Sequence, residues 1–133
     1  MKRDMELIRK ILFYVEENYT AGQGWIKQIN IDGYDSNTIT EHIILAYESG
    51  FFQDVKNIAT LSGNAYWVGN LSNEGYEFLD KIRNDTIWSK TKTAITKKGL
   101  PMVAETIKTV ATAFITATAE GMTNSILKNG GQL

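Results

Sequence analysis

The sequence predicts an α+β fold of the winged-helix class: three or four helices, a small three-stranded antiparallel sheet and a long C-terminal helix. Three observations lead to this prediction. The first twenty residues carry apolar side chains at helical spacing, residues 51–71 have the pattern of a β-hairpin, and residues 101–128 carry two apolar lines along one helix. The predicted order is helix, strand, helix, two-stranded wing, helix, as in a winged helix whose second helix is degenerate.

The first predicted helix begins after Asp4, because an aspartate side chain can cap the N-terminus of a helix. Its apolar residues form one stripe at helical spacing. They are Leu7, Ile8, Ile11, Leu12, Val15 and Tyr19. Two glycines within residues 21–24 end the helix. Ile29 and Ile31 then alternate with polar residues, which predicts a half-buried strand over residues 25–32.

The second helix is predicted to begin at Thr38, since Glu41 three residues later completes a capping box. Gly50 is a natural residue to end it. Residues 51–59 and 65–71 are predicted to form two strands joined by turn residues at 62–64, which makes a hairpin.

Ser72 caps the third predicted helix, which continues or kinks near Asn84 toward a lysine-rich segment. Pro101 suits the first turn of the final helix, which runs to Lys128. The expected domains are a winged-helix domain over 1–84, a basic helical connector over 85–99, a C-terminal oligomerisation helix over 100–128 and a frayed tail over 129–133.

The composition is that of a folded protein, with 43% hydrophobic and 22% charged residues among 133, which excludes wholesale disorder. The chain has no cysteine, so disulfides, thiolate metal sites and cysteine nucleophiles are excluded. No apolar segment follows the basic N-terminus as in a secretory signal. Residues 110–119 are too short and too polar to span a bilayer. We therefore expect a cytoplasmic protein.

The distribution of charge differs from that of a winged helix that binds DNA. Residues 1–80 have a net charge of −6, whereas a DNA-binding surface is normally basic. The second helix, which would be the recognition helix, has no lysine or arginine to contact a guanine edge. We therefore expect this region to bind a protein. The candidate partner-binding residues are Thr38, Glu41, His42, Leu45, Glu48 and Trp67.

Residues 81–98 form the one basic segment, with a net charge of +5. The simpler interpretation is a solvated helix surface that pairs with the acidic first part of the chain. The functional alternative is nonspecific contact with phosphate groups. Its candidate residues are Lys90, Lys92, Lys97 and Lys98.

The sequence contains no constellation that predicts catalysis or metal binding. His42 is the only histidine and no nucleophile elbow accompanies it, so we expect it to face solvent or a partner from the side of the second helix. Asp32 and Asp35 resemble part of a calcium loop, but Ile43 stands where the bidentate glutamate belongs. Turn formation and helix capping explain both aspartates. We expect no enzyme activity, no metal and no cofactor.

The final helix is apolar over an arc so wide that it must be buried somewhere. One interpretation is that it packs on its own domain. The other is self-association through close-packed small residues, and it predicts a homo-oligomer. The predicted oligomerisation stripe comprises Val103, Ile107, Val110, Phe114, Ala117 and Gly121.

Three segments together resemble an uncharacterised bacterial and phage family that is known only as a domain of unknown function. They are MKRDMELIRKIL, GYDSNTITEHIILAYESGFF and LSNEGYEFLDKIRNDTIWSKTK. The resemblance covers about residues 1–100 and implies a winged helix, a prophage setting and the cytoplasm of a bacterial host. It implies no activity and no catalytic residues. Tyr76 stands where the family pattern has a histidine, so no role of that histidine can apply here.

Two functional hypotheses follow. The first is a non-enzymatic interaction protein that forms a homo-oligomer and acts on a protein partner, such as a host transcription, replication or defence factor. The alternative is a DNA-binding transcriptional regulator that uses the basic segment at 81–98.

Overall fold

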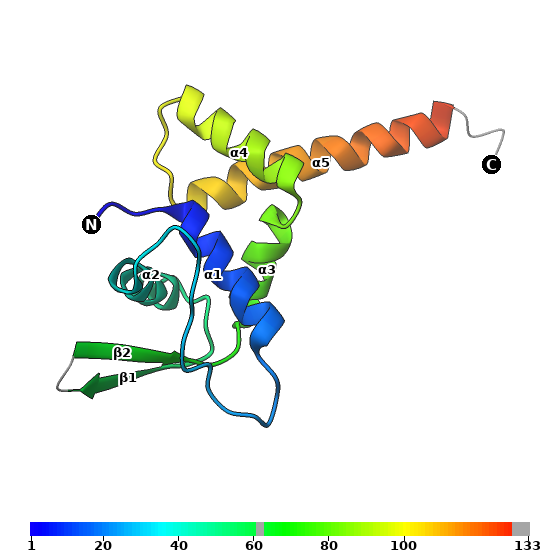
Figure 1. Cartoon of the computed structure of the whole chain (residues 1–133). Coiled ribbons are helices and arrows are strands. Elements are labelled where there is room, and N and C mark those ends of the chain that lie inside the picture. Colours follow the sequence, from blue (N-terminus) through cyan, green and yellow to red (C-terminus); the bar gives the residue numbers. More distant parts are fainter. Residues whose placement is uncertain (61–62, 129–133) are drawn as a thin grey trace. The chain divides into compact units, whose positions relative to one another are not determined.

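The computed structural model describes residues 1–60 and 63–128, with only the backbone described for 59, 60, 63–65 and 122–128. In chain order the elements are α1 (Met5–Asn18), α2 (Ser36–Glu48), β1 (Val55–Thr60), β2 (Gly63–Val68), α3 (Asn73–Ile82), α4 (Asp85–Lys97) and α5 (Ala104–Lys128) (Figure 1). The chain divides into two compact units, one over Met1–Leu79 and one from Asp80 onward.

The predicted winged-helix fold is wrong. The described residues form five helices and a sheet of only two antiparallel strands. The strand predicted over 25–32 is reduced to one antiparallel bridge, in which Ile26 and Val68 exchange backbone hydrogen bonds of 2.8 and 2.9 Å. Beyond this bridge Gln28 makes hydrogen bonds outside any sheet. Its side-chain amide donates to the Asn30 side chain, and its backbone carbonyl accepts from the Tyr14 hydroxyl. Such local bonds compete with a strand ladder.

Other boundaries differ by a few residues. The hairpin strands pair from Val55↔Val68 to Thr60↔Gly63, and part of the expected turn at 62–64 lies outside the described residues. α2 begins at Ser36 because Asp35, rather than a later residue, is its N-cap. Asn84 ends the third helix and caps a separate α4, since its side chain accepts from the Ile87 amide at 3.0 Å. The tail predicted at 129–133 also lies outside the described residues.

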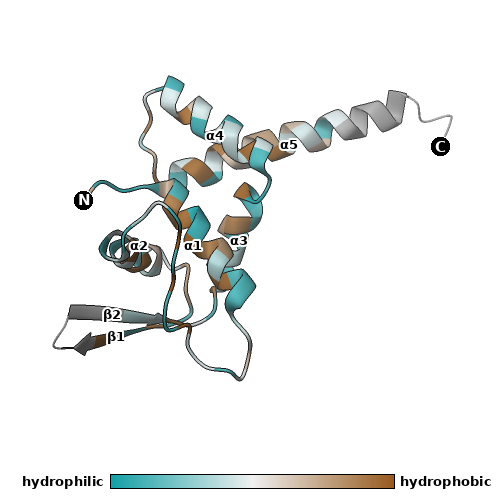
Figure 2. Cartoon of the chain, in the orientation of Figure 1, coloured by the Kyte–Doolittle hydropathy of each residue, from teal (hydrophilic) through white to brown (hydrophobic). Residues whose placement is uncertain are grey.

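α1 supplies the core of the first unit. The Asp4 side chain accepts hydrogen bonds from the Glu6 and Leu7 amides at 3.0 and 3.2 Å, which fixes where the helix begins. The apolar stripe then lies along one buried side of the helix, and α2 packs against α1 (Figure 2). In the same unit, Phe51 and Phe78 stack with ring centroids 4.6 Å apart. Burial of such side chains contributes most of the stability of a small domain.

The root of the hairpin is tied to two helices. Gly50 ends α2 with a positive φ of 84°. Its carbonyl accepts a short hydrogen bond from the Ser72 hydroxyl, which also accepts from the Gly75 amide at 2.9 Å and so caps α3. The Ser72 amide donates to the Phe51 carbonyl at 2.9 Å. The end of α2 and the start of α3 therefore hold the base of the hairpin from both sides.

The second unit is built on the packing of α4 against α5. Trp88, Ile95, Ile107 and Ala111 from these two helices are buried. At the start of α5, the Lys108 ammonium lies 2.8 Å from the Glu105 carboxylate and lowers the pKa of that carboxyl. No helix in the described part of the chain is both long enough and apolar enough to cross a membrane.

We predict that Gly75→Ala destabilises the first unit. A Cβ at position 75 would lie 2.1 Å from the Phe51 carbonyl oxygen, so α3 would have to move away. An alanine normally favours a helix over glycine by about 0.5–1 kcal/mol, but the forced shift should outweigh this and cost about 1–3 kcal/mol. Urea unfolding measures the change. The exposed control Glu77→Ala should stay within about 0.5 kcal/mol, and a stability of Gly75→Ala equal to the native one would contradict the packing.

Candidate functional site and interaction surfaces

His42 does not face solvent or a partner, so this part of the prediction is wrong. Its side chain is fully buried, with a relative exposure of 0%. The buried face of α2 consists of Ile39, His42, Ile43 and Ala46, whereas Tyr47 is 44% exposed. The histidine therefore lies inside the apolar face of α2 rather than beside it.

Both ring nitrogens of His42 are used to hold the backbone. Nε2 lies 2.9 Å from the Asp4 amide nitrogen, and Nδ1 lies 2.8 Å from the Thr38 carbonyl oxygen. Since an amide N–H can only donate, Nε2 accepts and Nδ1–H donates, which requires a neutral imidazole. The ring joins the start of α1 to the first turn of α2, and neither nitrogen remains for acid–base chemistry.

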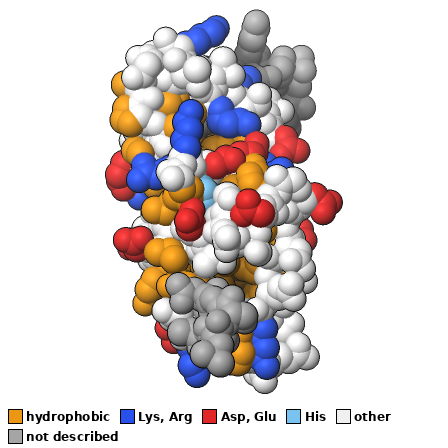
Figure 3. Space-filling view, turned by 60° about the vertical axis from the view of Figure 1, so that its left-hand side comes forward, with side chains coloured by type: hydrophobic (Ala, Val, Ile, Leu, Met, Phe, Trp, Pro, Cys, Tyr) orange, Lys and Arg blue, Asp and Glu red, His pale blue; other side chains and the backbone are white. Residues whose placement is uncertain are grey.

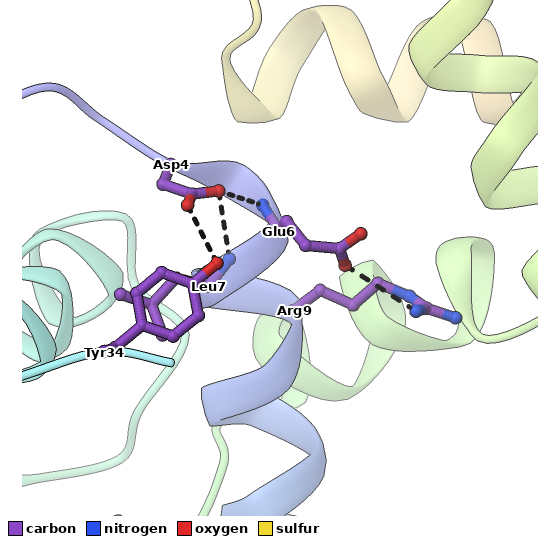
Figure 4. Close-up of polar contacts among 5 residues, drawn as sticks. All are labelled: Asp4, Glu6, Leu7, Arg9 and Tyr34. Atoms are coloured by element: carbon purple, nitrogen blue, oxygen red, sulfur yellow. Dashed lines mark hydrogen bonds and ion pairs between the residues drawn. The ribbon is translucent and has the colours of Figure 1, made fainter. Parts of the chain in front are cut away.

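Asp4 also holds a third segment. Its second carboxylate oxygen accepts from the Tyr34 hydroxyl at 3.0 Å, so the loop before α2 is tied to the start of α1 (Figure 4). Burial, followed by the hydrogen bond and the charge of Asp4, raises the pKa of Tyr34 above its ordinary value of 10.0. The phenol therefore stays protonated and keeps donating at neutral pH.

The backbone of Thr38 belongs to the same hydrogen-bond network. Its amide donates to the N-cap side chain of Asp35 at 2.7 Å while its carbonyl accepts from His42. The hydrogen bond from the Thr38 amide lowers the pKa of Asp35 below its ordinary value of 3.8. The polar residues 34–42 thus form a hydrogen-bonded joint between α1 and α2.

The exposed side of α2 is acidic. Glu41 and Glu48 are exposed and lie two turns apart, with the half-buried Leu45 between them. In the space-filling view of Figure 3, acidic side chains gather on the face that α2 helps to form. Such a surface repels phosphate groups.

Trp67 lies in the middle of a row of three side chains that sequence analysis did not bring together. The hairpin register pairs it with Lys56, and the bridge between Ile26 and Val68 places Lys27 on its other side. The Lys27 and Lys56 ammonium nitrogens lie 4.7 and 5.8 Å from the indole centroid. The hairpin pattern indicates Lys56 as a neighbour, but no local signal in the sequence indicates Lys27.

The basic segment is partly used within its own unit. The Lys92 ammonium lies 5.1 Å from the Trp88 ring centroid, and Arg83 forms an ion pair with Asp80 at 2.9 Å. Lys90, Lys97 and Lys98 are exposed. An open groove of about 420 Å³ runs beside them, lined by Ser89, Lys90, Thr93, Ala94, Lys97 and Phe114. Phosphate contact by this segment stays a prediction.

The predicted oligomerisation stripe divides into two parts. Ile107 is buried, whereas Val103, Val110 and Phe114 are half-buried, so this part lies within the protein's own fold. Ala117 and Gly121 are exposed, as is every residue from Ile115 to Gly121. Figure 1 shows α5 continuing past its contact with α4. Among the described residues no group of three or more His, Cys, Asp or Glu side chains could hold a metal ion.

Comparison with known proteins gives a family without an assigned activity. A family model described as "Hypothetical protein (DUF2513)" matches residues 2–101. The chain is also 36% identical over 115 residues to an uncharacterised protein of Haemophilus influenzae, a match that covers 86% of this chain and 96% of that protein. No solved structure matches.

We predict that His42→Ala destabilises the protein by about 2–4 kcal/mol. The substitution leaves a cavity and removes the partners of the Asp4 amide and the Thr38 carbonyl. Chemical denaturation followed by circular dichroism measures the loss. Glu41→Ala, one residue away but exposed, is the control and should change stability by less than about 0.5 kcal/mol. Equal stability of both variants would show that the imidazole does not stabilise the hydrogen-bonded joint between α1 and α2.

We predict that Asp35 contributes stability that depends on pH. Because folding lowers its pKa, the charged form stabilises the native state above the unfolded value of 3.8, and this contribution is lost as pH falls through the lower folded value. Asp35→Asn keeps a capping side chain without the charge. The native protein should be more stable than Asp35→Asn at neutral pH, and unfolding curves of the two should converge on acidification. If the difference in stability between the native protein and Asp35→Asn grew as the pH fell, the predicted direction of the pH dependence would be wrong.

Proposed function

This chain belongs to the DUF2513 family of hypothetical proteins, and we propose that it is a non-enzymatic protein-interaction module that self-associates through the exposed part of α5. The proposal depends on one observation. Residues 109–119 contain no charged side chain, and the part of this run from Ile115 onward is exposed although it is apolar or weakly polar.

The composition of this part of α5 supports packing against another molecule. Threonine is a poor helix former and short solvated helices are marginal, so packing would supply stability that propensity does not. The Thr118 hydroxyl donates to the Phe114 carbonyl at 3.0 Å within the helix. The Thr118 methyl group and the neighbouring alanines are then available for close contacts with another molecule. Ile115, which is 38% exposed, offers a larger side chain to bury.

A second copy of this chain is the occupant that fits best. The exposed surface from Ile115 to Ala119 has no charge that would select a partner of opposite sign. Small residues let two identical helices approach closely, and a two-fold axis repeats the same patch on both copies.

The acidic side of α2 supports a further protein partner with a basic, partly apolar surface. Glu41 and Glu48 would attract such a surface, and Leu45 would provide an apolar contact between them. The buried, fully bonded His42 supports a role without catalysis. The resemblance to prophage proteins makes a transcription, replication or defence factor of a bacterial host the class of partner to search.

We predict that Ile115→Glu shifts the full chain from dimer toward monomer and weakens the dimer at least tenfold, because each copy then places a carboxylate in a close-packed apolar contact. Sedimentation equilibrium over a range of concentrations measures the constant. Thr96→Glu adds one carboxylate at an exposed position of α4 and is the matched control, which should leave the dimer intact. A native protein that stays monomeric at high concentration, or equal weakening by both variants, would reject self-association through α5.

A further inference from the structure

One face of the hairpin combines two indoles with two lysines. Trp67 is half-buried, whereas Lys27 and Lys56 beside it are exposed. The next residue, Val68, is fully buried, so β2 follows the alternation of a strand with one face inward and Trp67 on the outer face. We call Trp25, Lys27, Lys56 and Trp67 the indole–lysine surface.

Trp25 extends this surface along the strand. A Cβ built on Gly69 would lie 3.7 Å from the Cζ3 atom of Trp25, so the indole covers the position where Gly69 has no side chain. Gly69 follows Trp67 by two residues, and a strand turns such residues to the same face. Two aromatic rings are therefore presented in succession on one side of the hairpin.

The two lysines have no carboxylate partner among the residues that the structure describes. Asp54 lies on the same face, since its Cβ is 3.9 Å from a Cβ built on Gly69, and one of its carboxylate oxygens accepts from the Val55 amide at 2.9 Å. Both ammonium groups contact the Trp67 indole, and at exposed sites such contacts contribute only about 0.5–1 kcal/mol. In Figure 3, basic and apolar side chains lie together at the end that carries the hairpin.

We propose that the indole–lysine surface binds single-stranded nucleic acid. An unpaired base stacks on Trp67 and a neighbouring base on Trp25, while the Lys27 and Lys56 ammonium groups move from the indole face to the phosphates on either side. The exchange is favourable because a phosphate attracts an ammonium group more strongly than a ring does, and each stacked base adds about 1–3 kcal/mol. Single strands are favoured over duplexes because the bases of a duplex are already stacked.

This inference is independent of the proposed self-association. The surface lies in the first unit, on β1, β2 and the segment before α2, and none of its residues belongs to α5. The net charge of −6 over residues 1–80 does not exclude it, because Lys27 and Lys56 together with Asp54 leave a net charge of +1 on this face and the exposed carboxylates of α2 belong to a different element. The local excess of positive charge decides where a phosphate binds.

The test is fluorescence anisotropy of labelled oligo(dT) and oligo(U) with the full chain at several salt concentrations. Trp67→Ala should weaken binding on the order of 5- to 150-fold. Trp67→Phe keeps an aromatic face and should restore most of the affinity, which separates stacking from a loss of folding. Lys27→Ala with Lys56→Ala should reduce the slope of log affinity against log salt by about 1.4, the value for two single-strand phosphate contacts.

The matched control is Lys2→Ala with Lys10→Ala, which removes the same charge from exposed positions at the N-terminus and on α1 and should leave affinity and salt slope nearly unchanged. Equal loss in both lysine pairs would show nonspecific attraction and overturn the proposal. Tighter binding to duplex DNA of the same length would also overturn it, as would no binding of single strands at low salt. The last measurement uses vesicles that contain phosphatidylserine. If Trp67→Ala weakened binding to the vesicles but not to the oligonucleotides, the surface would be assigned to membranes instead.

Discussion

The first unit depends on the hydrogen bonds that converge on Asp4. One carboxylate oxygen caps α1, the other accepts from Tyr34, and the backbone amide donates to the buried His42. Each of these bonds comes from a different part of the chain, so one residue sets the start of α1, the path of the loop before α2 and the rotation of α2. Buried polar networks of this kind specify an arrangement only when every member is satisfied. Here the imidazole, the phenol and the carboxylate each have partners.

The rotation of α2 decides which surface is available for function. With His42 inward, the glutamates at 41 and 48 point outward and the helix becomes an acidic face. A histidine in an apolar stripe is compatible with burial only because two backbone groups meet its nitrogens. The hydrogen bonds that hold His42 inside therefore also determine that Glu41 and Glu48 face outward.

Local chemistry predicted most helices and the hairpin, but not how they pair. The cap at Asp4, the break at Gly50 and the two hairpin strands are encoded by neighbouring residues, and the structure confirms them. The third strand of the sheet is not confirmed, because alternation over 25–32 carries no information on whether a partner strand is within reach. Burial of His42 depended on Asp4, 38 residues away. Likewise, the row Lys27–Trp67–Lys56 joins three separate segments, and no spacing rule in one sequence could reveal it.

The root of the hairpin has a mechanical consequence. Between Gly50 and Ser72 the chain leaves α2, forms both strands and returns to α3. Hydrogen bonds between Phe51 and Ser72 and between Asp54 and Gly69 close the base of this segment. A force applied to the strands is passed to the last turn of one helix and the first turn of the next. A molecule bound to the strands would therefore pull on a base that is hydrogen-bonded between the end of α2 and the start of α3.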